Sequence, residues 1–145
     1  MSLDATKAQR TPRTAQIMDD LKKDREKSAR MVVEAAYRVH KNLGPGLLER
    51  VYEACLTYEL EQAGCRVARQ VPVPIKYGAL TFNEGFRLDI LVDDEIVVEL
   101  KATDNPQPVW QAQLLSYLRL TGKRIGFLIN FNTVLFKDGI QRFVL

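Results

Sequence analysis

The chain has few residues of the kinds that build zinc sites and disulfides. Its 145 residues include one histidine and two cysteines, Cys55 and Cys65. The cysteines have no C-x-x-C spacing and no histidine beside them, which argues against a zinc site. We therefore expect two reduced, structural thiols and a cytoplasmic protein, because disulfides are rare in that compartment.

Long apolar runs are also absent from the sequence. No segment approaches the ~18 consecutive apolar residues of a membrane-spanning helix, and the N-terminus lacks the apolar core of a signal peptide. We expect no contact with a membrane. Hydrophobic residues nevertheless make up 46% of the chain, which is enough for one globular domain with a real core.

Most of the chain also lacks an excess of charge. The net charge of +3 comes from residues 1–30, which carry eight Lys/Arg against five Asp/Glu, whereas the remaining 115 residues carry thirteen of each. The uniform basicity typical of many nucleic-acid-binding proteins is therefore missing. Any electrostatic attraction for such a partner must come from a local patch or from the N-terminal segment.

The first 28 residues differ in composition from the rest. They are polar, mix both charges and contain the break Thr11-Pro12-Arg13, so they can bury little apolar surface. We expect this tail to be mobile, or helical only against a partner. Residues 29–145 form a single expected domain.

The spacing of apolar residues predicts eight elements after the tail. Helical spacing predicts two helices, separated by the Gly-Pro-Gly break at residues 44–46. Pro72 and Pro74 mark the first strand as an edge strand, and Gly122 ends a third helix. The expected order is α-α-β-β-β-α-β-β, an α/β (α+β) fold, with helices at 29–41 and 47–63, strands at 65–77, 86–92 and 95–101, a helix at 109–120, and strands at 124–131 and 134–143.

The hairpin formed by the second and third strands carries charges inside runs that otherwise resemble buried strands. Buried charges are costly unless they are paired or bound to metal. A two-residue turn would pair Asp89 with Val98, whereas a three-residue turn pairs Asp89 with Glu99. We predict the three-residue turn, which places Asp89, Glu99 and Lys101 on one surface, with cross-strand neighbours about 5 Å apart.

The predicted carboxylate pair would need a compensating group. Two carboxylates at that distance repel each other unless a proton or a cation lies between them. A hard divalent cation, which prefers oxygen ligands, is the natural occupant. Asp89, Glu99 and Lys101 also fit a structural ion-pair cluster on a solvated sheet face. The hairpin alone does not decide between these interpretations.

Three further polar residues extend the candidate site. Glu49 borders the buried stripe of its predicted helix. Gln113 and Tyr117 lie four residues apart on a later helix, so they share a face. Taken singly, Glu49 is an ordinary solvated carboxylate, and Gln113 and Tyr117 are ordinary polar residues at the edge of a core. Only together with the hairpin do they indicate a functional site.

The candidate residues follow one another in a recognisable order: Glu49, Asp89, Glu99-Leu100-Lys101, then Gln113 and Tyr117. This order resembles the PD-(D/E)XK nuclease superfamily with its restriction-endonuclease-like fold, a mixed β-sheet flanked by helices. Within the superfamily, residues 44–52, 117–122 and 129–131 resemble the small stand-alone proteins called GxxExxR, and the whole resemblance covers residues 30–145. The sequence departs from these patterns at two positions: Leu88 stands where the superfamily pattern has a proline, and Tyr52 stands where the GxxExxR pattern has an arginine.

The resemblance implies a nuclease that depends on Mg²⁺ or Mn²⁺. Asp89, Glu99 and the Leu100 backbone carbonyl would hold one or two ions, with Glu49 completing the shell. Lys101 would orient a water molecule and stabilise the charge that develops on the phosphate. Phosphodiester hydrolysis needs an activated water and neutralisation of the non-bridging oxygens, so this set of residues suits that reaction.

The resemblance also implies a nucleic-acid substrate, DNA or RNA. Gln113 and Tyr117 would position a substrate phosphate or a metal-bound water. Two other functions stay open: a catalytically silent nucleic-acid-binding or protein-interaction module that keeps the fold, and a structural or regulatory partner that uses the charged hairpin as an interface. Because we expect no separate recognition domain in a chain this small, a homodimer is a further hypothesis.

Overall fold

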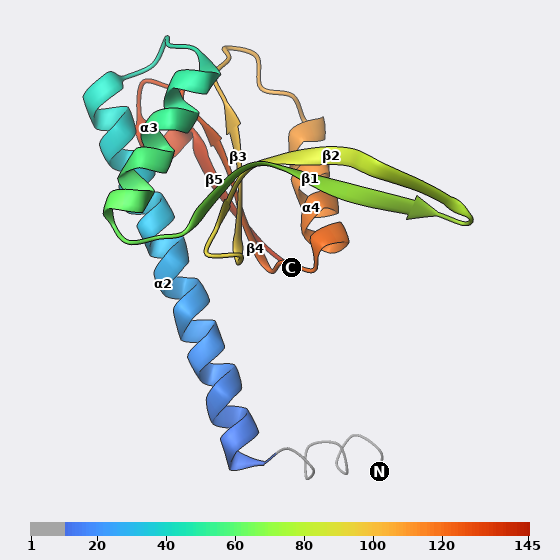
Figure 1. The fold of residues 1–145 in the computed structure, drawn as a ribbon. Coiled ribbons are helices and arrows are strands. Elements are labelled where there is room, and N and C mark those ends of the chain that lie inside the picture. Colours follow the sequence, from blue (N-terminus) through green and yellow to red (C-terminus); the bar gives the residue numbers. More distant parts are fainter. Residues whose placement is uncertain (1–10) are drawn as a thin grey trace.

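The protein is a five-stranded β-sheet with helices packed on both faces. In this computed structural model, which describes residues 11–145, the strands lie in the order β1-β2-β3-β4-β5. The helices are α2 (Pro12–Leu43), α3 (Glu49–Gln62) and α4 (Val109–Thr121), and the strands are β1 (Val67–Tyr77), β2 (Leu80–Val92), β3 (Ile96–Lys101), β4 (Ile125–Asn130) and β5 (Ile140–Val144). Strands β3 and β4 run parallel, and the other neighbours are antiparallel. The expected order of elements and the mixed sheet flanked by helices are confirmed (Figure 1).

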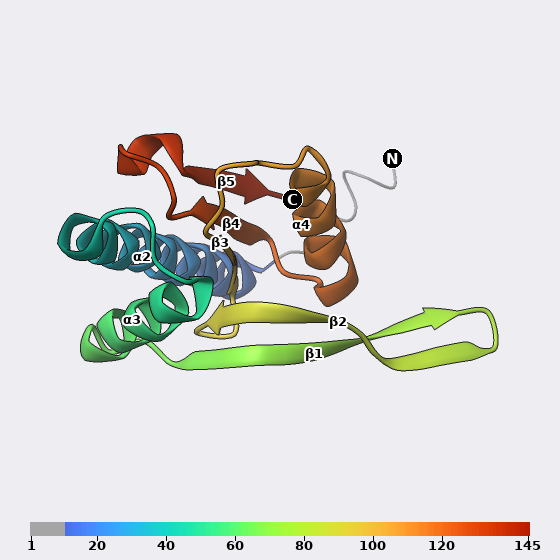
Figure 2. The same ribbon diagram turned by 90° about the horizontal axis from the view of Figure 1, so that it is seen from above.

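The core lies in two layers, one on each face of the sheet. On one face, buried side chains of β2, β3 and β4 pack against α2 and α3, and on the other face the sheet packs against α4 (Figure 2). The layer beneath α2 and α3 includes the fully buried aromatic residues Tyr52, Phe127 and Phe131. Within residues 11–145, no helix combines the length and the apolar character needed to cross a bilayer.

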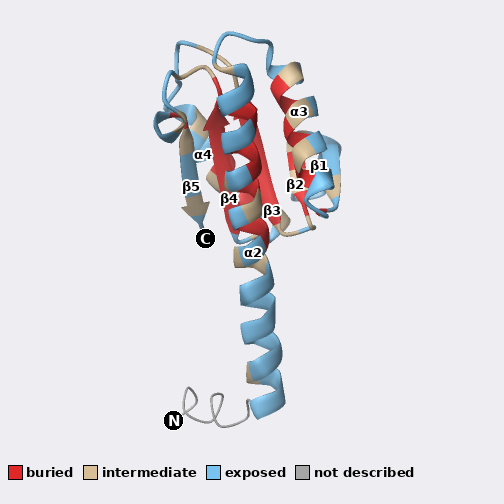
Figure 3. Cartoon of the chain, turned by 90° about the vertical axis from the view of Figure 1, so that its left-hand side faces the viewer, coloured by how far each residue is buried: buried red, intermediate tan, exposed pale blue. Residues whose placement is uncertain are grey.

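Helix α2 is much longer than the sequence predicted. It begins at Pro12, and the side chain of Thr11 accepts a backbone N–H of the first turn at 3.0 Å, two features typical of a helix start. The predicted start at Ala29 is wrong because burial, and not the helix, begins there: Ser28 is the first buried residue. The preceding turns form a largely exposed extension (Figure 3). Residues 1–10 of the predicted tail lie outside the described residues, and the division into tail and domain stays a prediction.

Helix α3 is fixed to its surroundings by Tyr52. The Tyr52 hydroxyl donates to the carbonyl of Gly44 at 2.6 Å and accepts the N–H of Leu47 at 3.1 Å. Its ring stacks on Phe131, which follows β4, with 4.6 Å between the ring centroids. These contacts hold the loop between α2 and α3 and thereby the first residue of α3, Glu49.

Strands β1 and β2 form a long hairpin that extends past the rest of the sheet (Figures 1 and 2). Strand β1 is an edge strand, as its prolines predicted. Strand β2 begins at Leu80 rather than near Phe86, and its outer part pairs Phe82 with Ile75 and Leu80 with Tyr77. Most residues of this outer part are exposed, so it lacks the burial from which a strand can be predicted.

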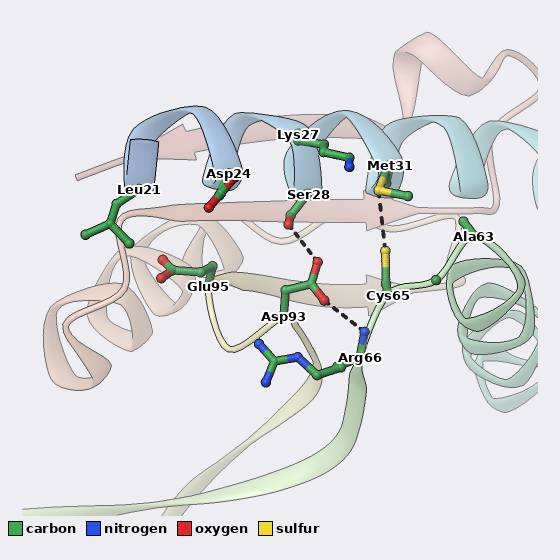
Figure 4. Close-up of a pocket in the computed structure, with 11 residues that line it drawn as sticks. Leu21, Asp24, Lys27, Ser28, Met31, Ala63, Cys65, Arg66, Asp93 and Glu95 are labelled. Atoms are coloured by element: carbon green, nitrogen blue, oxygen red, sulfur yellow. Dashed lines mark hydrogen bonds between the residues drawn. The ribbon is translucent and has the colours of Figure 1, made fainter. Parts of the chain in front are cut away.

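The turn between β2 and β3 contains three residues, 93–95, as predicted. Asp93 fixes this turn to two other segments (Figure 4). Its carboxylate accepts the hydroxyl of Ser28 on α2 at 2.7 Å and the backbone N–H of Arg66, just before β1, at 2.8 Å. Asp93 and Asp94 both have positive φ angles, a conformation that aspartate tolerates better than most residues. The contacts of Asp93 therefore support the longer turn and the register that it sets.

The last predicted strand, residues 134–143, is only partly correct. The chain first forms a short 3₁₀-helix, η1 (Phe136–Asp138), and β5 begins at Ile140. Gly139 explains the bend, because a Cβ at this position would lie 2.1 Å from the carbonyl oxygen of Asn130. The carbonyl of Gly139 accepts the Asn130 N–H at 2.8 Å. This close approach of two backbones could not be predicted from the apolar residues around it.

Candidate active site

Two carboxylates meet where strands β2 and β3 separate. The backbone pairs end at Ile90 with Val98, and the next positions along both strands are Asp89 and Glu99. Here side chains bridge the strands: Glu99 Oε1 accepts the N–H of Asp89 at 3.2 Å, and Asp89 Oδ2 accepts the N–H of Leu100 at 2.8 Å. The prediction that a three-residue turn brings Asp89 opposite Glu99 is confirmed.

Burial changes the protonation of this pair. Glu99 is only 8% exposed, and its burial, followed by the charge of Asp89, raises the pKa of Glu99 to about 8. Burial also raises the pKa of Asp89, although the hydrogen bond from Leu100 opposes this effect. Without a cation, the two carboxylates therefore retain a proton close to neutral pH.

Lys101 lies beside the pair and is held over an aromatic ring. Its Nζ is 5.0 Å from the centre of the Trp110 ring on α4, a cation–π geometry. The charge of Lys101 opposes the rise in pKa at both Asp89 and Glu99. Lys101 is therefore close enough to act on the same chemistry as the two carboxylates.

Helix α4 also brings Tyr117 to the carboxylates. The Tyr117 ring stacks on Phe86 of β2 with 4.3 Å between centroids. Burial and then the charges of Glu99 and Asp89 raise the pKa of Tyr117. Gln113 lies one helical turn earlier and is exposed, and its side chain forms no hydrogen bond to another of the described residues. The structure thus brings Tyr117 close to the Asp89–Glu99 pair and leaves Gln113 at the edge of the candidate site.

Helix α3 supplies two carboxylates to this region. Glu49 is largely exposed, but partial burial of its carboxyl group, followed by the charge of Asp89, raises the pKa of Glu49. Glu53, one turn later, is buried, and its charge contributes to the raised pKa of Asp89. Sequence reasoning missed Glu53, although its four-residue spacing from Glu49 places both on one helix face.

The fold and this group of side chains can now be compared with known families. A family model described as the PD-(D/E)XK nuclease superfamily matches residues 26–143, most of the chain. The chain belongs to the PD-(D/E)XK nuclease superfamily. No curated protein and no solved structure matched the chain. The resemblance to the superfamily, stated from the sequence, is confirmed, whereas the narrower resemblance to GxxExxR proteins is not shown by this match.

Nucleases of the PD-(D/E)XK superfamily generally use divalent metal ions, and the residues present here suit such an ion. The donors at the hairpin are carboxylate oxygens without histidine or cysteine, a set that favours a hard cation. The raised pKa of Glu99 means that the protein's own charges compensate the pair poorly, so a bound cation would relieve an existing repulsion.

The pair does not form a complete cage. Among residues 11–145, no three His, Cys, Asp or Glu side chains are grouped closely enough to hold a metal ion. The N–H of Leu100 points toward β2, and the carbonyl of the same residue lies on the same edge of the strand. Asp89, Glu99 and the Leu100 carbonyl would therefore hold the ion together with water, which Mg²⁺ commonly retains.

Proposed function

We propose that this protein is a Mg²⁺- or Mn²⁺-dependent nuclease that hydrolyses phosphodiester bonds of DNA or RNA at the Asp89–Glu99 pair. The observation that carries the proposal is the pair of carboxylates on facing strands, Glu99 buried and Asp89 half-buried, with a raised pKa at Glu99. Membership of the nuclease superfamily supports a nucleic-acid substrate.

Each residue of the site has a proposed part in the reaction. Asp89, Glu99 and the Leu100 carbonyl would hold the metal, and Glu49 would complete the shell. A bound divalent cation would lower the pKa of a water molecule and neutralise charge on the phosphate oxygens. Lys101, with its ammonium over Trp110, orients the attacking water and stabilises charge that develops on the phosphate.

The polar residues of α4 have a positioning part in this proposal. The hydroxyl of Tyr117 binds a substrate phosphate or a metal-bound water beside Glu99, and its stacking on Phe86 fixes the ring. Gln113 lies one turn away on an exposed part of the same helix face, where it can contact substrate without moving the backbone.

Three narrower assignments belong to the same proposal. The segment 44–52, with Gly46 and Glu49 at their expected places, supports placing the chain among GxxExxR proteins. Cys55 and Cys65 are both free thiols, which supports a reducing, cytoplasmic environment. A homodimer would enlarge the surface available to a long substrate.

Cleavage of a mixed panel of single- and double-stranded DNA and RNA tests the proposal. The wild type and Lys101→Ala are compared with Mg²⁺, with Mn²⁺ and with EDTA. Cleavage by the wild type alone, and only with metal, supports a nuclease centred on this hairpin. Equal cleavage by both proteins would place the activity elsewhere. Metal binding without any cleavage would favour the catalytically silent binding module.

A further inference from the structure

An arginine from β1 is held beside the candidate site by a buried glutamate. Arg69 donates from Nε at 3.1 Å and from Nη2 at 2.8 Å, both to Oε2 of Glu53 on α3. Gln70 donates from Nε2 to the other oxygen, Oε1, at 2.6 Å. The carboxylate of Glu53 therefore joins α3 to two consecutive residues of the edge strand.

This contact lies at the level of Asp89. In the register of β1 and β2, Arg69 pairs with Ile90 and Val71 pairs with Leu88, so Gln70 stands across from Asp89. Gln70 has a φ angle of 51°, a left-handed conformation that is unfavourable for a residue with a side chain. The strand adopts this unfavourable conformation at the point where Arg69 and Gln70 turn toward Glu53.

Arg69 retains donors that the ion pair does not use. A guanidinium has five N–H groups in a planar fork, and both nitrogens that contact Glu53 bind one oxygen. The Arg69 side chain is 43% exposed, whereas that of Glu53 is 11% exposed. One side of the guanidinium is thus anchored on a buried acid and the other side reaches solvent.

The surroundings of Asp89 are rich in negative charge, which opposes the approach of a phosphate. Four carboxylates act in this region: in addition to burial, the charges of Asp89 and Glu53 raise the pKa of Glu49, the charge of Glu53 raises that of Asp89, and the charge of Asp89 raises that of Glu99. Lys101 and a divalent cation at the Asp89–Glu99 pair would offset only part of this charge. An arginine suits the additional role, because its fork matches phosphate geometry and it stays charged at any working pH.

We propose that Arg69 contacts a backbone phosphate of the nucleic-acid substrate, and that Glu53 and Gln70 hold it in place for this contact. The inference rests on the proposed nuclease function and names a substrate contact that the sequence did not predict. Arg69 is a substrate-binding residue here, and Glu53 is a positioning residue.

Arg38 provides a matched control for the test. It also pairs with a glutamate of α3, Glu59, at 3.0 Å, and its side chain is 44% exposed. Arg38 lies on α2, and its side chain pairs with Glu59 and with none of the candidate-site residues. Fluorescence anisotropy with labelled DNA and RNA oligonucleotides, in Mg²⁺ and over a range of salt, measures binding. All proteins carry Lys101→Ala so that the probe stays intact.

Arg69→Ala should weaken binding by about tenfold. The slope of log Kd against the logarithm of the salt concentration should fall by about one, as expected for the loss of one phosphate contact. Arg38→Ala should leave both values unchanged. Glu53→Gln, which keeps a hydrogen-bond acceptor for Arg69, should retain most of the binding. Equal Kd and equal salt dependence for Arg69→Ala and Arg38→Ala would overturn the proposal and leave the ion pair purely structural.

A purely structural part for Arg69 has its own signature. It predicts that Arg69→Ala and Glu53→Gln lower the melting temperature while the folded variants bind normally, and this result would also overturn the proposal.

The cleavage panel separates the failure of this inference from the failure of the nuclease proposal. Cleavage by the wild type together with normal binding by Arg69→Ala removes only the Arg69 inference. Oligonucleotide binding that depends on Arg69, without wild-type cleavage, removes only the nuclease proposal. Failure of the Lys101→Ala protein, without any further substitution, to bind any probe would overturn the inference.

Discussion

Asp89 and Glu99 face each other across the end of the β2–β3 hairpin, and each carboxylate accepts a backbone N–H from the opposite strand. Two acids in this position cost stability when both are ionised, because burial removes the water that would screen their repulsion. A proton relieves the repulsion at low pH, and a divalent cation would relieve it at neutral pH. Stability, pH and metal binding are therefore linked at one place in the fold.

The unfolding free energy of the metal-free protein should fall between about pH 4.5 and about pH 8. Across this window Glu99 keeps its proton in the folded state, where its pKa is raised to about 8, and loses it in the unfolded state, where the value is near 4.5. A folded state that binds more protons loses stability as pH rises. Circular dichroism melts in EDTA at several pH values measure the effect.

Glu99→Gln isolates this contribution, because it removes the titrating group and keeps the shape. The variant should show a flatter dependence of melting temperature on pH than the wild type. Glu61→Gln, at an exposed position of α3, should keep the wild-type dependence. Identical pH profiles for the wild type and Glu99→Gln would contradict the burial of an uncompensated Glu99.

Lys101→Ala should abolish cleavage while lowering the unfolding free energy by about 1 kcal/mol or less. The structural losses are the attraction between Lys101 and the two carboxylates and the cation–π contact with Trp110, which contributes about 0.5–1 kcal/mol. Chemical denaturation and the cleavage assay measure the two effects. Lys137→Ala, on the exposed η1 segment, should retain full activity. A loss of several kcal/mol in Lys101→Ala would favour a structural ion-pair cluster.

Tyr117→Phe should reduce cleavage several-fold without changing the melting temperature. The phenylalanine keeps the stacked contact with Phe86 and removes only the hydroxyl beside the carboxylates. Tyr58→Phe, an exposed tyrosine of α3, serves as the control and should retain full activity. Wild-type cleavage by Tyr117→Phe would show that the hydroxyl has no part in the reaction.

Asn130→Ala should cost about 2–4 kcal/mol, because three hydrogen bonds are lost and their backbone partners stay in place. The buried Asn130 side chain accepts the N–H groups of Thr103 and Asn132 and donates to the carbonyl of Thr103 at 2.9 Å. Asn42→Ala, at an exposed asparagine of α2, should cost well under half as much. Urea unfolding of both variants measures the difference, and equal losses would show that the Asn130 network contributes little.

The β2–β3 hairpin was predictable from its alternation of apolar and charged residues and from the length of its turn. The alternation allowed two registers, and only the three-residue turn brought Asp89 and Glu99 together. The structure adds the reason that the sequence did not show, which is the pair of hydrogen bonds from Ser28 and Arg66 to Asp93.

The early start of α2 at Pro12 was missed because the first turns are exposed and carry no apolar stripe wide enough to indicate a buried face. Two other features depend on contacts between distant segments. The bend at Gly139 comes from its close approach to Asn130. Arg69 could not be assigned to Glu53 from the sequence, because no local pattern relates an edge strand to a particular turn of α3.

Manganese binding by the purified protein tests whether Asp89 and Glu99 form a metal site. Titration calorimetry with Mn²⁺ compares the wild type, Glu99→Gln and the control Glu61→Gln at a pH of about 8, where Glu99 has lost about half of its proton occupancy and a cation competes with the rest. We expect the wild type and the control to bind Mn²⁺, and Glu99→Gln to lose at least about tenfold in affinity. Equal affinity in all three proteins, or no binding in any of them, would contradict a metal site at Asp89 and Glu99.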